Sequence, residues 1–558
     1  MSQEQRMQGQ PMIILGDDAQ RMKDESAQDH NISAAQAVAE SVRSTLGPKG
    51  MDKMLVTSLG DIVVTNDGVT ILDEMDIDNP TAEMVVEVAE TQEEEAGDGT
   101  TTAVAIAGDL LKNAQDLLER DIHPTAVIKG FTLASEQARE ELDEIAVDVE
   151  SDDHDRLEQV AATAMTGKGA EEYSDHLSSL VVDAAQAVTV EADDGSTVVD
   201  LAFMKIETQT GQSPGASEFI RGGAISKDPV HEDMPTDIED GDVLLVDQSL
   251  ELSEAEADTQ VSVTDPSQLE EFIQQEEQEL RAIADNIADL GADIVLCQKG
   301  IDDMVQHYLA KEGILAVRRV KRSDIEFLRE VLGAKVVSEL ETATTEDLGS
   351  GTVSRDDDEE LFYIEGTNDE AHGVTLLLRG STDHVVDEIE RGVNDALDVV
   401  ASALTTGQVL PGGGAPETEL AGRLREFADS VSGRQQLAVE AYADALEVVP
   451  RVLAENAGYD SIDTLVELRA AHSDGEERVG INVHSGDIED TLEAGIVETP
   501  HTKKQALSAA SEAANLVLKI DDIISAGDLS TEGDDEEDGG PGGAGGMGGM
   551  GGGMGGMM

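Results

Sequence analysis

Hydrophobic residues recur at three- and four-residue steps over much of the chain, which is the spacing of one buried helix face. Four segments show this pattern most clearly, at residues 26–45, 84–95, 104–118 and 386–404. The stretch from 124 to 190 is also largely helical in its pattern. Short apolar runs at 243–246 and 294–296 instead predict buried strands. Because strands and helices alternate from about 220 to 370, we expect an α/β layer domain inserted in a helical one.

The stretch at residues 97–102, Gly-Asp-Gly-Thr-Thr-Thr, lies where one predicted helix ends and the next begins. A helix N-terminus carries free N–H groups and partial positive charge, glycines let a ligand approach the backbone, and threonine hydroxyls add donors. These features suit an anionic phosphate, and Asp98 beside it could hold magnesium. For this hexapeptide alone, a plain turn with a helix cap is an equal alternative.

Two further residues could join such a site. Asp67 lies in an Asn-Asp-Gly turn after the β-branched run at 62–65, and this turn predicts a hairpin with the apolar residues that follow. Lys168 lies between two glycines, but Ala162 and Gly169 occupy the positions where a P-loop needs Gly and Ser or Thr. Taken alone, Asp67 reads as a turn residue and Lys168 as a solvated loop lysine, with a phosphate sensor as the alternative for Lys168.

Asp395 belongs to the helix predicted at 386–404. It lies about 200° around that helix from Val393, on the side away from the apolar stripe. On this pattern alone we expect Asp395 to be solvent-exposed. The helix ends before three glycines at 412–414, which permit a ligand or a backbone segment to approach closely.

Charge restricts the partners that the protein can have. The chain has 558 residues, enough for about three domains. Its 120 acidic and 36 basic residues give a net charge of −84, which repels itself in dilute buffer. Molar salt relieves this repulsion, because the Debye length falls to about 3 Å. We therefore interpret the acidity as adaptation to a salt-filled cytoplasm, and direct nucleic-acid binding is disfavoured.

Cysteine content and hydropathy both predict a protein of the cytosol. The single cysteine, Cys297, lies in an apolar run and is expected to be a buried structural thiol in a reducing cytosol. The start of the chain is polar and no run of 18 apolar residues occurs, so a signal peptide and a membrane span are unsupported. The acidic and Gly-Gly-Met tail at 528–558 is expected to be flexible, since it can bury little side chain.

Several motifs occur in an order that resembles a known family. They are 46–50 (Leu-Gly-Pro-Lys-Gly), 66–72 (Asn-Asp-Gly-Val-Thr-Ile-Leu), 97–102, 394–396 (Asn-Asp-Ala), 412–414 and the Gly-Gly-Met tail. Together they look like a chaperonin. The longer run at 45–55 and the Asp-Ile-His-Pro segment at 121–124 resemble the group II chaperonins, whose archaeal members are called thermosomes. With its acidity, the chain resembles an archaeal subunit of haloarchaeal type from about residue 12 to 530.

This resemblance implies a multidomain α+β chaperonin fold. It has a largely α-helical equatorial domain, an α/β intermediate domain, and an inserted α/β apical domain with a helical lid protrusion. The implied boundaries are 1–148 and 406–527 for the equatorial domain, 149–219 and 370–405 for the intermediate domain, 220–369 for the apical domain with its lid at about 249–279, and 528–558 for the tail.

The resemblance also implies roles for individual residues. Asp67 and Asp395 would orient and polarise the attacking water, and Asp395 would reach the phosphate only when the subunit closes. Asp98 would bind magnesium, and Lys168 would belong to a nucleotide-sensing loop. The implied nucleotide-binding residues are Leu46, Gly47, Pro48, Asp98, Gly99, Thr100, Thr101, Thr102, Lys168, Gly413, Asn482 and Glu498. Thr499 departs from the family, where a proline usually follows the glutamate, and this bears on the shape of the base site.

The implied function is that of an ATP-dependent molecular chaperone. It would bind non-native polypeptides and enclose them in a double-ring chamber whose lid closes through magnesium-dependent ATP hydrolysis. Its cofactors would be ATP and Mg²⁺, and its partners client polypeptides and further copies or paralogous subunits, with neither nucleic acid nor membrane. Two alternatives stay open: a passive scaffold that holds unfolded chains without productive hydrolysis, and a metabolic phosphotransferase, which would need neither the tail nor the acidic insert.

Overall fold

The structure is a computed structural model that describes most of the chain. The described residues are 21–23, 25–56, 60, 62–75, 77–167, 173–192, 195, 197–252, 266–367 and 373–524. Three predicted features lie outside these ranges, namely Lys168, the tail at 528–558, and residues 253–265 of the expected lid. Within the described ranges, no helix combines the length and the hydrophobicity that a bilayer crossing requires.

The chain forms two compact units, residues 28–520 and the two chain ends together. In the unit of the two ends, β1 (Arg21–Lys23) pairs antiparallel with β21 (Asp522–Ile524). All other elements, apart from the first residues of α1, belong to the larger unit. The larger unit contains the candidate site and three large hydrophobic clusters.

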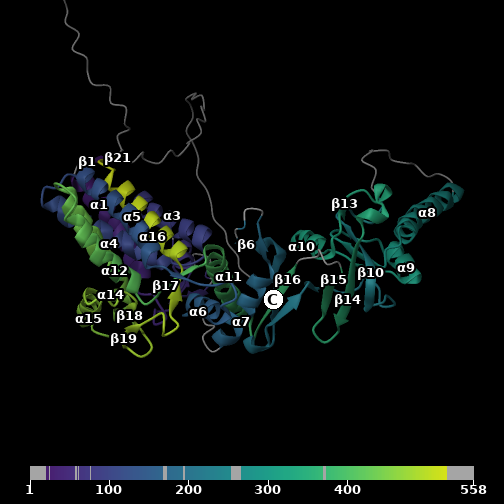
Figure 1. Cartoon of the computed structure of the whole chain (residues 1–558). Helices are drawn as coiled ribbons and strands as arrows, with labels where there is room; N and C mark the ends of the chain where they lie inside the picture. The colour runs from purple at the N-terminus through teal and green to yellow at the C-terminus, as the bar shows by residue number, and fades with distance from the viewer. Residues whose placement is uncertain are drawn as a thin grey trace, which may run out of the picture. The chain divides into compact units, whose positions relative to one another are not determined.

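The largest cluster joins helices from distant parts of the chain, and we call this region the helical body. Its buried residues come from 32–145 and from 410–518, so neither segment completes this core alone. Its helices are α1 (Glu25–Arg43), α2 (Gly68–Asp73), α3 (Pro80–Ala96), α4 (Thr100–Glu119), α5 (Pro124–Ile145), α12 (Ala415–Ala428), α13 (Gln435–Leu446), α14 (Val448–Asn456), α15 (Ser461–Ser473) and α16 (Pro500–Leu518). In Figure 1 the yellow-green α16 runs among the purple and blue α3, α4 and α5, against which it packs.

A second cluster lies around a three-stranded sheet, and we call this region the three-stranded layer. Its buried residues come mainly from 149–188 and 374–409. The central strand, β16, is parallel to β7 and antiparallel to β8. The elements are β7 (Met204–Thr210), β8 (Glu218–Arg221), β16 (Val374–Gly380), α6 (His154–Met165), α7 (Ser174–Ala187) and α11 (Asp383–Thr406). Every residue of β16 is buried, as expected for a central strand.

The third cluster, from residues 225–364, lies around a seven-stranded mixed sheet. Strands β12, β11 and β10 are parallel, and β10, β14, β15 and β9 continue the sheet antiparallel, with β13 also pairing with β10. Its elements are β9 (Gly223–Ser226), β10 (Ile238–Val246), α8 (Pro266–Leu290), β11 (Ile294–Cys297), α9 (Asp303–Glu312), β12 (Leu315–Val317), α10 (Arg322–Leu332), β13 (Val336–Val337), β14 (Gly349–Asp356) and β15 (Leu361–Gly366). The strands predicted at 243–246 and 294–296 are therefore present, and Cys297 is buried as expected.

Short strands and 3-10 helices connect these regions. They are β2 (Lys53–Val56), β3 (Ile62–Thr65), β4 (Val147–Asp148), β5 (Thr189–Glu191), β6 (Thr197–Val199), β17 (Gln408–Pro411), β18 (Val479–Ile481), β19 (Ile488–Asp490), β20 (Val497–Glu498), η2 (Leu201–Phe203), η3 (Pro214–Ala216), η4 (Leu340–Thr342) and η5 (Thr345–Asp347). Strand β17 pairs antiparallel with both β20 and β4, so it joins the strand that precedes α16 to the strand that follows α5.

The hairpin predicted at the Asn-Asp-Gly turn is wrong. Strand β3 pairs back onto β2, and helix α2 begins directly after Asp67. The Asp67 carboxylate accepts the main-chain N–H of Thr70 at 2.8 Å, as a helix N-cap does. Aspartate serves caps and turns equally well, and here the cap prevails because α2 buries Ile71 and Leu72.

Candidate functional site

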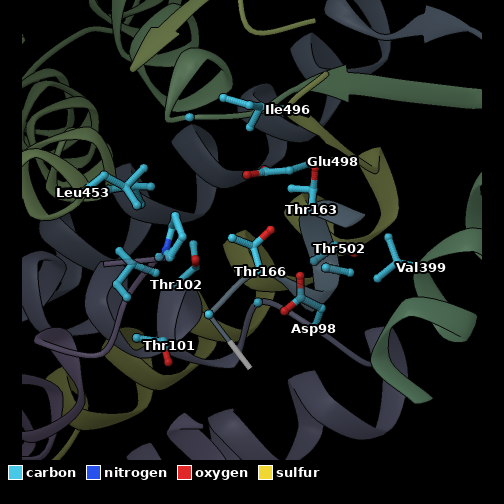
Figure 2. Close-up of a pocket in the computed structure, with 18 of the residues that line it drawn as sticks. Asp98, Thr101, Thr102, Thr163, Thr166, Val399, Leu453, Ile496, Glu498 and Thr502 are labelled. Carbon is cyan, nitrogen blue, oxygen red and sulfur yellow. The ribbon is translucent and has the colours of Figure 1, made fainter. Parts of the chain in front are cut away.

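A cavity of about 350 Å³ lies within the larger unit, between the helical body and the ends of α6 and α11. This volume lies in the range of small-molecule sites. Its lining comes from within segments 45–48, 66–68, 98–102, 160–167, 481–484 and 495–499, with further residues from α3, α11, α14 and α16 and with Gly413. Figure 2 shows side chains from these segments around the cavity, including Asp98, Thr166 and Glu498.

The N-terminus of α4 opens onto this cavity. Gly99 precedes the helix in a left-handed conformation, with φ of 84°, and has no side chain to cap it. The first N–H groups of a helix have no acceptor within it, so those of α4 can bind an anion. Thr100, Thr101 and Thr102 line the cavity beside them. Gly68 lets its loop pack closely against the start of α4, because a Cβ at this position would lie 2.6 Å from the Thr101 hydroxyl.

Asp98 is held in place through its main chain. Gln92, fully buried in α3, donates from Nε2 to the carbonyl of Asp98 at 2.7 Å and to that of Thr502 at 3.2 Å. Gln92 thus ties the Asp98 loop to α16. Figure 2 shows the Asp98 and Thr502 side chains on the side of the cavity away from Leu453.

Asp98 provides a donor set that fits magnesium. Its carboxylate and the neighbouring threonine hydroxyls are the oxygen ligands that Mg²⁺ prefers. Within the described ranges, no group of three or more His, Cys, Asp or Glu side chains forms an all-protein metal site. Mg²⁺ in nucleotide sites is usually bound by one or two carboxylates together with phosphates and water.

Asp67 lines the same cavity, and one of its carboxylate oxygens has a fixed orientation. Its Oδ2 accepts from both the main-chain N–H and the hydroxyl of Thr70, at 2.8 and 2.7 Å. Its own N–H donates to the hydroxyl of Thr65 at 3.1 Å. Arg391 of α11 reaches the same hydroxyl at 3.5 Å. Contacts through Thr65 therefore connect the Asp67 turn to the helix that carries Asp395.

The prediction that Asp395 is solvent-exposed is wrong. Asp395 is 5% exposed, because the side of α11 away from its apolar stripe is covered as well. Its side chain is not among the described groups that line the cavity, although Val399, about one helical turn further along α11, does line it. The structure thus brings Asp67 and Asp98 to one cavity and places Asp395 nearby in the helix that borders it.

The remaining predicted nucleotide-binding residues divide into two groups. Leu46, Gly47, Pro48, Gly413 and Glu498 line the cavity. The side chain of Asn482 is engaged elsewhere: its amide donates to Glu489 Oε1 at 2.9 Å, and its Oδ1 accepts the N–H of His484 at 3.0 Å. Asn482 thus shapes the turn before His484, which does line the cavity.

Close packing fixes the loop that contains Gly47. A Cβ at this position would lie 2.3 Å from the Cδ2 of Leu453, and its φ of 78° also favours glycine. Asn456 donates to the carbonyl of Leu46 at 2.9 Å. Helix α14 therefore holds this loop at the cavity.

Glu498 belongs to a cluster of three charged side chains, with Lys503 and Glu417, that the sequence did not predict. Lys503 Nζ lies 2.7 Å from Glu417 Oε1 and in direct contact with Glu498 Oε2. Burial raises the pKa of Glu498, and Lys503 opposes that shift. Burial lowers the pKa of Lys503, but Glu417 and Glu498 together raise it above its usual value. Thr499, which departs from the family pattern, caps α16 by accepting the N–H of Thr502.

Sequence reasoning missed several residues that build this site. Gln92 and Lys503 act through contacts between helices distant in sequence, and Thr163 and Thr166 face the cavity from α6 and its end. No motif spacing marks any of them. Asn66 belongs to the predicted Asn-Asp-Gly turn, and its amide contacts the carbonyl of Gly167, the residue before Lys168.

Comparisons with known proteins agree on one family. A model of the TCP-1/cpn60 chaperonin family matches residues 38–528. The chain is 69% identical over 533 residues to "Thermosome subunit beta" of Halobacterium salinarum, covering 95% of this chain and 96% of the relative. It is 67% identical over 537 residues to "Thermosome subunit 2" of Haloferax volcanii, covering 96% of each.

A solved structure has the same fold. It is the open-state monomer of a group II chaperonin from Methanococcoides burtonii, 40% identical with a TM-score of 0.60, and the match covers 76% of this chain and all of that one. The predicted multidomain α+β chaperonin fold is confirmed. The chain therefore belongs to the TCP-1/cpn60 chaperonin family, as a group II chaperonin of haloarchaeal type.

Proposed function

We propose that the cavity at the N-terminus of α4 is where this chaperonin binds and hydrolyses ATP. Family membership makes the chain an ATP-dependent chaperone, with ATPase activity, that assists protein folding in a ring chamber. The site of that activity is our proposal. The observation that carries it is the glycine-capped start of α4, which faces a cavity that Asp67 and Asp98 also line.

The phosphates are expected at the start of α4. The N–H groups there, the hydroxyls of Thr100, Thr101 and Thr102, and the positive end of the helix dipole all favour an anion. The loop of Leu46, Gly47 and Pro48 closes the same side of the cavity. Asp98 would hold a magnesium ion, which when bound offsets the charge of the phosphates.

Asp67 and Asp395 are the proposed catalytic residues. Phosphoryl transfer depends mainly on positioning and on charge control, so the chain has to place the attacking water and accept its proton. Thr70 fixes one carboxylate oxygen of Asp67, which orients the other for a water. Asp395 would complete the pair when α11 moves toward the cavity, which couples hydrolysis to closure of the subunit.

The sugar and the base of the nucleotide are proposed to lie against Gly413 and Glu498. Both residues line the cavity, and Asn482 supports its wall through the turn before His484. Lys168 is proposed to sense the phosphates from the loop after α6. Apolar groups such as Ile481, Val483 and Ile496 offer the base a surface without charge.

The domain layout and the assembly extend this proposal. We assign the helical body to the equatorial domain, the three-stranded layer to the intermediate domain and the seven-stranded sheet to the apical domain, with the boundaries predicted above. Chaperonins of this family form rings and bind clients. We propose stacked double rings of this chain, alone or mixed with paralogous subunits, that enclose non-native polypeptides in the cytoplasm beneath closing lids.

Refolding by the purified chain at molar KCl tests this function. With magnesium and ATP we expect phosphate release and recovery of a denatured client enzyme. A non-hydrolysable ATP analogue should bind without raising the yield. Equal recovery with ATP and with the analogue would favour the passive scaffold, and a monomer that phosphorylates a small-molecule acceptor would favour the phosphotransferase.

A further inference from the structure

Three charged side chains from three different elements meet at the wall of the cavity. Lys503 of α16 lies between Glu417 of α12 and Glu498 of β20. Lys503 and Glu417 are only 8% and 2% exposed, whereas the side chain of Glu498 is 25% exposed and lines the cavity. The buried pair therefore supports the member of the cluster that a ligand can reach most easily.

Without Lys503, the carboxylate of Glu498 would lie in an unfavourable place. It is largely buried, and both Glu417 and Asp98 add negative potential there. A carboxylate in such surroundings takes up a proton or turns away unless a cation compensates it. Contact with Lys503 supplies that cation and fixes Oε2. Oε1 lies toward Gly412, where a Cβ would come within 3.2 Å of it.

High salt weakens exposed ion pairs much more than buried ones. The chain carries 36 basic residues against 120 acidic ones, and exposed ion pairs lose most of their strength when the Debye length falls to about 3 Å. A buried pair is screened much less. The Lys503–Glu417 pair is therefore built to hold its geometry in the molar salt that the acidic surface requires.

We propose that Lys503, fixed by Glu417, is a positioning residue that holds the Glu498 carboxylate in the orientation needed to accept hydrogen bonds from the sugar hydroxyls of the bound nucleotide. This inference rests on the proposed nucleotide site and deepens it. A carboxylate that accepts from a hydroxyl forms a charge-assisted bond, about twice as strong as a neutral one. The site should therefore prefer ribonucleotides over deoxynucleotides. This preference should depend on Lys503, although Lys503 does not itself bind the sugar.

The test compares kcat/KM for ATP, 2′-deoxy-ATP and 3′-deoxy-ATP, using the full chain at molar KCl with magnesium. We expect the native protein to prefer ATP over at least one deoxynucleotide by about tenfold or more, the worth of one charge-assisted hydrogen bond. Lys503→Met should remove most of this preference, through a higher KM for ATP with kcat little changed. Glu498→Gln should do the same.

Two further variants separate positioning from folding. Lys503→Met leaves two glutamates without their cation, and Glu417→Gln in the same chain neutralises one of them, so the cluster returns to its native net charge of −1. This double variant should fold with the preference still lost. Lys504→Met, at the neighbouring lysine that pairs with Asp143 on the surface, should leave the preference unchanged. A native-like ratio of ATP to deoxynucleotide in the double variant would overturn the inference.

Other outcomes also decide the matter. Equal losses of activity with all three nucleotides would indicate a merely structural cluster and would overturn the positioning assignment. Equal kcat/KM values of the native protein for ATP and both deoxynucleotides would also overturn the positioning assignment, but they would not contradict the proposed nucleotide site. If the native protein hydrolysed no ATP in the presence of magnesium, the proposed function itself would fail.

Discussion

Two regions of this chaperonin bury a cation between two glutamates, and they show why burial of charge does not by itself mark function. In the helical body, Lys503 contacts Glu417 and Glu498, and both Lys503 and Glu498 line the cavity. In the three-stranded layer, Arg379 is 4% exposed and lies 2.8 Å from Glu218 and 2.6 Å from Glu359.

The difference lies in what each cluster faces. Arg379 uses its remaining donors on the protein, with Nε directed to Gln209 at 3.2 Å and Nη1 to the carbonyl of Ala216. Glu359 belongs to the turn between β14 and β15, so this cluster joins the seven-stranded sheet to the three-stranded layer. The same chemistry therefore stabilises an interface in one region and, we propose, prepares a ligand site in the other.

The largest expected effect is at the proposed catalytic end of the cavity. Asp395→Asn should lower kcat by about 10²–10⁴, because loss of a general base usually has a cost of that size. Nucleotide binding should persist, since Asp395 does not line the cavity. Phosphate release and fluorescent-nucleotide binding measure the two properties. Asp387→Asn, at an exposed position of α11, is the matched control, and equal losses in both variants would contradict the assignment.

Removing the proposed metal ligand should have the next largest effect. Asp98→Asn should raise the magnesium concentration needed for half-maximal ATPase activity by about tenfold or more, because a neutral amide is a weaker ligand for Mg²⁺ than a carboxylate. A magnesium titration of the steady-state rate measures this change. Glu94→Gln, exposed on the neighbouring α3, should titrate like the native protein. An unchanged titration for Asp98→Asn would place the ion elsewhere.

Breaking the cluster in the three-stranded layer sharpens the comparison directly. Arg379→Met should lower stability by about 1–3 kcal/mol, because it removes a buried cation with its hydrogen bond to the Ala216 carbonyl, while the two carboxylates it pairs with are partly exposed. The ATP-to-deoxynucleotide preference of the folded fraction should stay native, in contrast to Lys503→Met. Urea unfolding followed by circular dichroism measures the first quantity and steady-state kinetics the second. A lost preference in Arg379→Met would erase the distinction between the two clusters.

Cys297 is a buried titratable group in the core around the seven-stranded sheet. Burial in the seven-stranded sheet raises the pKa of its thiol to about 11 from 9.0. The folded state then holds the proton more tightly than the unfolded state, so stability is full below about pH 9 and falls between about pH 9 and 11. The loss should reach about 2–3 kcal/mol. Urea unfolding from pH 8 to 11, with Cys297→Ser as the control, measures it.

Thiol labelling gives a second measure of the same feature. At pH 8 the native protein should react with iodoacetamide about a hundredfold more slowly than the unfolded chain, from the thiolate fraction alone. Rapid labelling of the native protein would show that Cys297 is neither buried nor protonated as described.

Much of the site could be predicted from local sequence. The Gly-Asp-Gly-Thr-Thr-Thr stretch produces a glycine cap followed by a helix, and both are determined by neighbouring residues, so the phosphate end follows from spacing. The buried strands at 243–246 and 294–296 follow from their apolar runs for the same reason. The chaperonin fold was predictable because several motifs occur in the family's order along the whole chain.

Features that depend on long-range packing could not be predicted. Asp395 was expected in solvent because periodicity reports one stripe of a helix, not a second layer that covers its other side. Lys503 and Gln92 owe their positions to helices some 80 and 410 residues away, which no local pattern encodes. Asp67 caps a helix instead of starting a hairpin, because capping and turning use the same side-chain hydrogen bond.

A cryo-electron microscopy structure of the assembled protein with magnesium and a non-hydrolysable ATP analogue, at molar KCl, would locate the nucleotide and its ion. We expect the triphosphate at the N-terminus of α4, the ion on Asp98, and the carboxylates of Asp67 and Asp395 within reach of the terminal phosphate in the closed subunit. An analogue bound outside this cavity, or a closed subunit in which Asp395 stays too far from Asp67 and Asp98 to share that ligand, would contradict this expectation.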